Sequence, residues 1–403
     1  MIRVVITGAG CVSAIGNNLA SFRDSLFAAR SGIREMPDPP PGLHFTHAAI
    51  ADDFRPDDVL LASQRQLADR SASFAVAAAR QAVEQSGIVA AHSPDSIGVL
   101  FGCSAGGRLS EEQEAAKLYT RNARVHPLTV PRTMANAGTS LVAMEHRVTG
   151  PSLTLSTACA SGAHALGLAF HMIRSGSLRA ALAGGHEAPL SFAFLRAWDS
   201  LKVVSPTACR PFARDRDGMT LAEGAAVFAL ESLESAQTRG AGILAEIVGF
   251  GMSSDAHHMT QPDPAGPAAA MLRAIEDAGA TRADVGYINA HGTATDINDR
   301  VEAEAIHRVF GDRARTLPIS STKGLHGHAI GASGAIELLA TLLALREQRL
   351  PPNAGLRGPV DPDPTLNLDR VLLVSEPAAL SLALSSSFAF GGMNAVLALR
   401  SYS

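Results

Sequence analysis

The chain has 403 residues, of which 46% are hydrophobic and 18% are charged, and its formal net charge is −4. At ~150 residues per domain, this length corresponds to two or three domains. The composition excludes a disordered chain, which needs low hydrophobicity and high net charge, and the charge predicts no nucleic-acid surface. The longest mainly apolar stretch, Ala335–Leu345, is about half the ~20 residues of a membrane-spanning helix.

The four cysteines, Cys11, Cys103, Cys159 and Cys209, form no CxxC pair. The apolar start of the chain is interrupted by Gly8, which is not typical of a signal peptide. We therefore expect reduced thiols and a cytoplasmic protein.

The first predicted strand runs into glycines in Val4–Gly16, VVITGAGCVSAIG. A dinucleotide-binding loop would need a third glycine where Ser13 stands, and an acidic residue about 20 positions further on. Neither is present. We therefore expect a glycine turn between a strand and a helix, and no dinucleotide site.

Two pairs of segments indicate an internal duplication. Arg80–Gly102 and Leu272–Gly292 each predict a helix, a glycine turn, an aspartate and a short apolar strand. Ser152–Ser175 and Leu317–Ala344 each predict a strand, a tight turn and an apolar helix. Alternating strands and helices favour an α/β class. The sequence thus predicts a duplicated, five-layered α-β-α-β-α fold.

The expected halves are residues 1–240, which carry a candidate nucleophile, and residues 241–403, which carry two candidate catalytic histidines. The first half is longer because of polar or proline-rich stretches around 35–65 and 108–132. Long insertions of this kind are usually functional loops or interface elements.

Cys159 lies at a strand-to-helix junction among small residues. The positive end of a helix dipole lowers the pKa of a thiol, so a nucleophile is one interpretation; a buried, inert cysteine is the other. His291 and His328 each stand in a glycine-rich turn after a predicted strand. His326 and His328 lack a third ligand at metal spacing, so no metal site is expected. A cysteine–histidine hydrolase remains an alternative at this point.

Eight motifs around these positions carry a resemblance to a known family. They are RVVITGAGCVSAIG, GPSLTLSTACASG, LAGGHEA, RPFARDRDGMTLAEGAA, EIVGFGMSSDAHHMT, NAHGTATDINDRVEAEA, SSTKGLHGHAIGASGAIE and SSSFAFGGMNAVLAL. Over nearly its whole length the chain resembles the β-ketoacyl-[acyl-carrier-protein] synthases of the thiolase-like superfamily. It is most similar to elongating type II enzymes and to their nodulation-factor and polyketide relatives.

The resemblance implies a role for each matching residue. The implied catalytic residues are Cys159 as acyl acceptor, His291 and His328, the motif lysine Lys323, Glu302 as its ion-pair partner, and Phe390 as a gate whose backbone N–H completes an oxyanion hole with that of Cys159. The implied substrate-binding residues are Thr293, Thr295, Ala105, Phe388 and Asp299.

The activity implied is the decarboxylative Claisen condensation of malonyl-carrier protein with an enzyme-bound acyl group, in fatty acid or polyketide elongation. The alternative is a non-catalytic, chain-length-determining subunit of a heterodimer. No cofactor is implied beyond the phosphopantetheine of acyl carrier protein. The implied partners are that acidic carrier protein and a second chain, either a copy of this one or a sister ketosynthase-like chain. Four arginines are candidates for docking the carrier: Arg65, Arg70, Arg124 and Arg132.

The chain departs from the family pattern at four positions. Ala389 replaces a glycine beside the gate and Met393 a threonine, and His326 replaces another threonine. Ala105 stands where an isoleucine is common. A smaller side chain in the acyl pocket leads us to expect longer or bulkier acyl groups, unless a neighbouring side chain fills the space. An alanine in place of a glycine either stiffens the gate or keeps a conformation that alanine tolerates.

Overall fold

The computed structural model describes residues 1–355 and 358–402. In this part of the chain ten strands form one sheet, in the order β10-β9-β15-β16-β8-β1-β7-β6-β4-β5. The first half contributes β1 (Val4–Ser13), β4 (Ile97–Gly102), β5 (Ser152–Leu155), β6 (Ala180–Glu187) and β7 (Gly224–Ser232). The second half contributes β8 (Ala245–Ser254), β9 (Tyr287–Asn289), β10 (Ile319–Ser320), β15 (Leu382–Ala389) and β16 (Met393–Arg400).

The strands of the two halves have the same spatial order. From the centre outwards, each half places its first strand, then its fifth, fourth, second and third. The two first strands, β1 and β8, pair antiparallel where the halves meet. On this repeated order we propose that the domains divide at residue 240, between β7 and β8.

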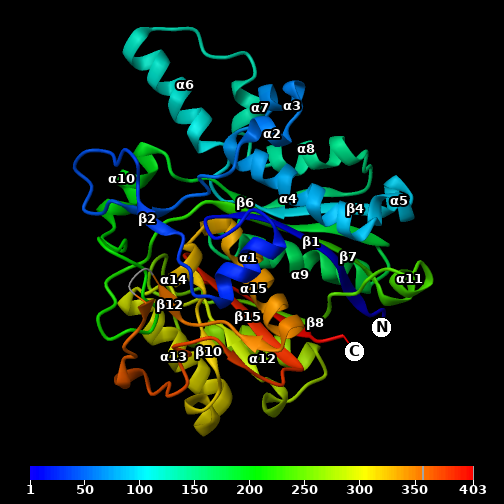
Figure 1. Ribbon diagram of the computed structural model, residues 1–403, viewed down its shortest axis with the longest axis vertical. Coiled ribbons are helices and arrows are strands. Elements are labelled where there is room, and N and C mark those ends of the chain that lie inside the picture. Colours follow the sequence, from blue (N-terminus) through cyan, green and yellow to red (C-terminus); the bar gives the residue numbers. More distant parts are fainter. Residues whose placement is uncertain (356–357, 403) are drawn as a thin grey trace.

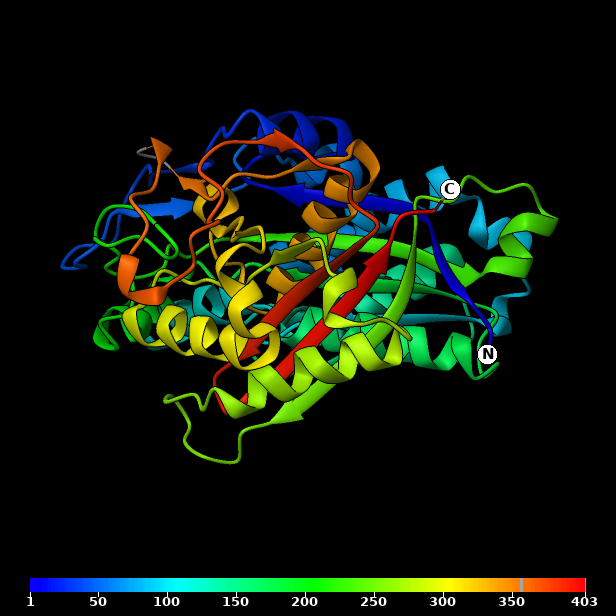
Figure 2. The same ribbon diagram turned by 90° about the horizontal axis from the view of Figure 1, so that it is seen from below.

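Three helical layers enclose the two halves of the sheet. The outer layer of the first half contains α4 (Arg70–Ser86) and α8 (Ala137–His146), the middle layer α9 (Ser161–Arg174) and α15 (Ser333–Glu347), and the outer layer of the second half α12 (Ala265–Asp277) and α13 (Asp296–Phe310). Figure 1 shows these layers one above another. Figure 2 shows the yellow and yellow-green helices of the second half along the red strands β15 and β16. The predicted five-layered fold is confirmed.

Glycines in the two central strands allow the outer helices to pack closely. Gly8 and Gly10 lie inside β1, and a Cβ added there would meet backbone oxygens of α4 at 2.3 and 2.1 Å. Gly249 and Gly251 occupy β8 in the same way, 2.3 and 2.0 Å from backbone oxygens of α12. The expected glycine turn was therefore wrong: the glycines are needed for helix–sheet contact in both halves.

The two insertions of the first half form separate elements. One contains β2 (Ile33–Glu35), β3 (His47–Ala49), α2 (Pro56–Val59) and α3 (Ala62–Leu67), and the other contains α6 (Arg108–Arg121) and α7 (Thr129–Thr133). Figure 1 shows α6 projecting from the layered body.

The remaining helices and small sheets connect the layers. They are α1 (Leu19–Phe27), α5 (Ile88–Ala91), α10 (Phe192–Ser200), α11 (Leu233–Thr238), α14 (Lys323–His326), the pair β11 (Arg349–Leu350) and β14 (Glu376–Pro377), and the pair β12 (Ala354–Gly355) and β13 (Gly358–Pro359). Among the described residues, no helix combines the length and the apolar character needed to cross a membrane.

Candidate active site

The candidate nucleophile lies in a strained turn between β5 and α9. Ala158, the residue before Cys159, has a left-handed φ of 47°, a conformation that non-glycine residues adopt at an energetic cost. Ser161 closes the turn from both sides: its hydroxyl donates to the Ala158 carbonyl at 2.6 Å and accepts from the Thr157 N–H at 2.9 Å. The turn therefore holds Cys159 at the N-terminus of α9.

His328 comes to Cys159 from the second half, in the segment that precedes α15. The Nε2 atom of His328 lies 3.1 Å from the Cys159 Sγ, and its Nδ1 atom lies 2.7 Å from the Ser333 hydroxyl at the start of α15. A hydroxyl donates or accepts as required, so Ser333 supports either neutral tautomer of His328. The packing of α9 against α15 thus brings the sulfur and the imidazole together.

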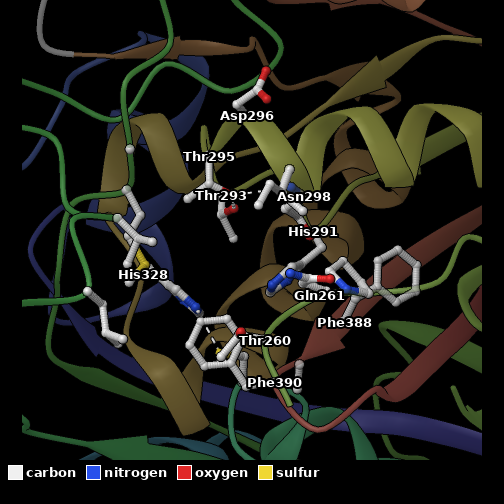
Figure 3. A pocket seen from close by; sticks show the side chains of 18 of the residues that line it. Thr260, Gln261, His291, Thr293, Thr295, Asp296, Asn298, His328, Phe388 and Phe390 are labelled. Atoms are coloured by element: carbon white, nitrogen blue, oxygen red, sulfur yellow. Dashed lines mark hydrogen bonds between the residues drawn. The ribbon is translucent and has the colours of Figure 1, made fainter. Parts of the chain in front are cut away.

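His291 follows β9 and faces the same point. Its ring centroid lies 5.5 Å from that of His328, and Figure 3 shows the two imidazoles approaching from opposite sides. The Lys323 ammonium is 3.2 Å from His291 Nδ1 and also donates to the His291 carbonyl. An ammonium only donates, so Nδ1 accepts, and Nε2 carries the proton.

Lys323 is fully buried, and its ion-pair partner is Glu337 of α15. The Lys323–Glu302 pair expected from the resemblance is not formed. Glu302 instead accepts the backbone N–H groups of His291 and Gly292, at 2.8 and 2.7 Å. Glu302 is therefore a positioning residue that holds the turn carrying His291.

Burial and the Lys323 charge determine the protonation of the site. Burial lowers the pKa of His291 and of His328 well below the usual value, and the Lys323 ammonium lowers both further. Both imidazoles are therefore neutral near pH 7. Burial raises the pKa of the Cys159 thiol to about 12, although Lys323 opposes the shift. The lowered thiol pKa that we expected from the helix N-terminus was wrong, because desolvation of the thiolate is the larger effect.

A cavity of about 450 Å³ leads to these three residues. Thr293, Thr295 and Asn298 form a polar part of its wall, and in Figure 3 they lie across the cavity from Phe390. The Thr293 and Thr295 hydroxyls are 2.9 Å apart, and Thr295 also caps the N-terminus of α13.

Asp299 lies behind this wall. Its buried carboxylate accepts the backbone N–H groups of Phe212, at 2.7 Å, and of Ala294, at 3.1 Å. Burial raises its pKa to about 6, although these hydrogen bonds oppose the shift. In this structure Asp299 supports the loop that carries the two threonines.

The predicted gate lies where β15 ends. The Phe388 ring is buried against His291, at 6.0 Å between centroids, while Phe390 is 36% exposed and lines the cavity. Ala389 belongs to β15, and the left-handed residues of this turn are Gly391 and Gly392, with φ of 82° and 70°. The alanine therefore has an ordinary strand conformation, and the conformational freedom of the turn comes from the two glycines.

Ala105 lies in the turn after β4. Its N–H donates to Glu187, a buried carboxylate that also accepts from the N–H groups of Ser104 and Gly331. Glu187 thereby ties the turn after β4 to the segment that follows His328. Ala105 is outside the described lining of the cavity, so its effect on acyl preference stays a prediction.

Three residues of the site were not expected from the sequence: Glu337, Ser333 and Glu187. An ion pair at Glu337 could have been predicted, because Glu337 is a lone acidic residue in an otherwise apolar helical segment. Such residues are rarely buried without a partner. Ser333 and Glu187 had no comparable signal, because their contacts come from distant segments.

The ligand atoms of Cys159, His291 and His328 all lie within 4.8 Å of one another. One thiolate and two imidazoles are ligands that zinc accepts. The buried Lys323 ammonium beside them repels a cation, and this charge favours a set of reacting groups over a metal site.

Comparison with known proteins identifies the family. Residues 1–236 match the profile of the β-ketoacyl synthase N-terminal domain, and residues 244–357 that of the β-ketoacyl synthase C-terminal domain. The chain belongs to the β-ketoacyl synthase family. Two relatives of this synthase are nodulation protein E of a Rhizobium species, 40% identical over 99% of both chains, and 3-oxoacyl-[acyl-carrier-protein] synthase 2 of a Synechocystis strain, 38% identical over 99% of this chain and 98% of that one. The solved ishigamide ketosynthase/chain length factor is 33% identical over the full length of both chains, with a TM-score of 0.93.

The ion pair of Lys323 is tested by a double-mutant cycle on the free energy of unfolding. We expect Glu337→Gln in the synthase to lower it by ~3–5 kcal/mol, the usual cost of leaving one buried charge without its partner. In combination with Lys323→Met, most of this loss should disappear. A matched cycle that combines Glu302→Gln with Lys323→Met should show a smaller coupling free energy. A larger coupling for Glu302 would contradict the assignment.

The raised pKa of Cys159 predicts the pH dependence of its alkylation. Only the thiolate reacts with iodoacetamide, so below the pKa the rate should rise about tenfold per pH unit. With a pKa of about 12, the rate should still be rising at pH 9, as followed by intact mass with Cys159→Ala as the control. A plateau near pH 7 would support the lowered pKa expected from the helix N-terminus.

Proposed function

We propose that this β-ketoacyl synthase joins an acyl group on Cys159 to a malonyl thioester by decarboxylative Claisen condensation, giving a 3-oxoacyl thioester. The observation that carries the proposal is the convergence of one thiol and two neutral imidazoles at the end of one cavity. Both catalytic histidines and the nucleophile are present, so the alternative of a non-catalytic subunit is not favoured.

In the first step the Cys159 sulfur attacks the carbonyl carbon of the acyl thioester. Its proton passes to His328 Nε2, which lies 3.1 Å away, and then to the departing pantetheine sulfur. The N–H groups of Cys159 and Phe390 are the proposed donors to the oxyanion, and one such donor is typically worth ~10²–10³ in rate. Covalent attachment divides a difficult transfer into two easier steps.

In the second step the malonyl thioester occupies the cavity, with its pantetheine amides along Thr293 and Thr295. The bond between the carboxyl carbon and the methylene carbon breaks, CO₂ leaves, and the electron pair forms an enolate. His291 donates its Nε2–H to the enolate oxygen, and His328 does so in its Nε2–H tautomer, with Ser333 donating to Nδ1. The methylene carbon then attacks the acyl carbonyl and releases the Cys159 thiolate, which recovers a proton.

The proposed substrates are carried by acyl carrier protein, as the name of the Synechocystis relative indicates for that enzyme. The only prosthetic group that the proposed reaction uses is then the phosphopantetheine of the carrier protein. We propose the cytoplasm as the location of the protein. Of the arginines predicted to dock the carrier, Arg70 pairs with the buried Glu223, and Arg65 pairs with Asp57. This leaves Arg124 and Arg132 as the docking candidates without such a pair.

The condensation is tested by incubating the protein with a panel of acyl-carrier proteins and recording intact mass. We expect one acyl adduct, absent from Cys159→Ala, that disappears with release of CO₂ when malonyl-carrier protein is added. In His291→Ala the adduct should form and persist, because acyl transfer does not need that imidazole. Absence of an adduct with every donor would contradict the proposal.

We also propose that a second copy of this chain covers the free edge of the sheet. β5 is the last strand of the sheet, and its Leu153 is 43% exposed. α8 packs against β5, α7 against α8 and α6 against α7. These helices expose further apolar side chains, Met144, Val130 and Tyr119. Unpaired, apolar edges of this kind promote pairing with another chain.

Leu153→Glu should shift the protein from dimer to monomer, because two such charges would meet across a two-fold axis. The measurement is mass by light scattering after size-exclusion chromatography. Leu373→Glu is the matched control, since Leu373 is 39% exposed in the other half and away from this edge. A wild-type monomer, or equal behaviour of the two variants, would contradict the proposal.

A further inference from the structure

The gate residue Phe390 stacks on a tryptophan. The ring centroids of Phe390 and Trp198 lie 5.8 Å apart with an interplanar angle of 24°, an offset stacking geometry that is favourable for aromatic pairs. Trp198 is the only tryptophan in the chain, and both rings line the cavity that ends at Cys159.

The two rings have different freedom to move. Trp198 lies on α10, and both ends of that helix are anchored. Glu112 of α6 accepts the N–H groups of Phe192 and Ala193 at 2.8 Å each, and Asp199 accepts the His44 N–H at 3.2 Å. Trp198 itself is 8% exposed and packs in the same apolar cluster as Cys159. It is a fixed surface.

Phe390, in contrast, stands at the end of β15 and is followed by the two left-handed glycines. It is 36% exposed, whereas Cys159 at the end of the cavity is 7% exposed. The Phe390 ring is therefore more exposed to solvent than the nucleophile, and the two glycines that follow it give the backbone more conformational freedom than other residues would.

We propose that Trp198 is a positioning residue that holds Phe390 in its resting place and so limits access to Cys159. This inference rests on the proposed function, in which Cys159 accepts the acyl group. Stacking on an anchored helix stabilises one position of a mobile ring, and an incoming acyl chain or pantetheine arm displaces that ring. The strength of the stack then sets how often the gate admits a substrate.

The test is the rate of Cys159 alkylation by iodoacetamide at one pH, followed by intact mass. Trp198→Leu should react faster by about threefold to tenfold, the change expected from the loss of one aromatic pair. Trp198→Phe keeps a ring and should restore the wild-type rate. Phe194→Leu is the matched control. Phe194 packs edge-on against Trp198, with ring centroids 6.0 Å apart, and its loss should leave the alkylation rate unchanged.

An unchanged or slower rate in Trp198→Leu, or an equal increase in Phe194→Leu, would overturn the inference. If Trp198 had only a structural role, Trp198→Leu would lower the melting temperature and leave the rate of Cys159 alkylation unchanged. Alkylation by iodoacetamide needs no acyl donor. If the protein failed to accept acyl groups, the proposed function would be contradicted, but the alkylation rates would still measure access to Cys159.

A second measurement keeps the inference testable if Trp198→Leu does not fold. Trp198 is the only tryptophan, so the tryptophan fluorescence of the protein is sensitive to the contact between Trp198 and Phe390. Phe390→Ala should move the emission maximum to longer wavelength, because water reaches the indole face that Phe390 covers. An unchanged spectrum would overturn the inference.

Discussion

A lysine ammonium buried between His291 and α15 organises the electrostatics of the site. Lys323 has no exposed surface, and its contacts are the Glu337 carboxylate and both the ring and the carbonyl of His291. Burying a charge is costly unless it is paired and hydrogen-bonded, so the arrangement is evidence of organisation more than of stability. Burial keeps His291 neutral and the Lys323 charge lowers its pKa further, while the ammonium occupies Nδ1 and leaves the proton on Nε2.

The duplication of the fold explains where this site lies. The two halves have the same strand order, and their equivalent helices, α9 and α15, form the shared middle layer. Each of these helices starts after a turn with a left-handed non-glycine residue, Ala158 in one half and Ile330 in the other. Because the helices pack together at these ends, the nucleophile of one half meets the histidine of the other.

The reactivity of Cys159 reflects a competition between two effects. A helix N-terminus favours a thiolate, but removal of the thiol from water disfavours it more strongly, and the pKa rises. A buried thiol with a raised pKa needs a base in contact when it attacks. The proposed base is His328, whose Nε2 lies 3.1 Å from the sulfur, and the Ser333 hydroxyl can donate to or accept from its Nδ1 as the tautomer changes. In the proposed reaction the same burial would shield an acyl thioester on Cys159 from water.

Much of the protein was predictable from its residues, because local patterns report local structure. Alternating strand and helix patterns, repeated in two halves, predicted the layered α/β fold. The turns around Cys159, His291 and His328 made these residues candidates, and the resemblance to a known family selected them. What only the tertiary structure decided were contacts between distant segments. The pairing of Lys323 with Glu337, the support of His328 by Ser333, the packing role of Gly8 and Gly10, and the stack of Trp198 on Phe390 all depend on how the layers meet. The tertiary structure also decided the direction of the Cys159 pKa shift. Burial depends on the whole fold, whereas a helix N-terminus can be predicted from one segment.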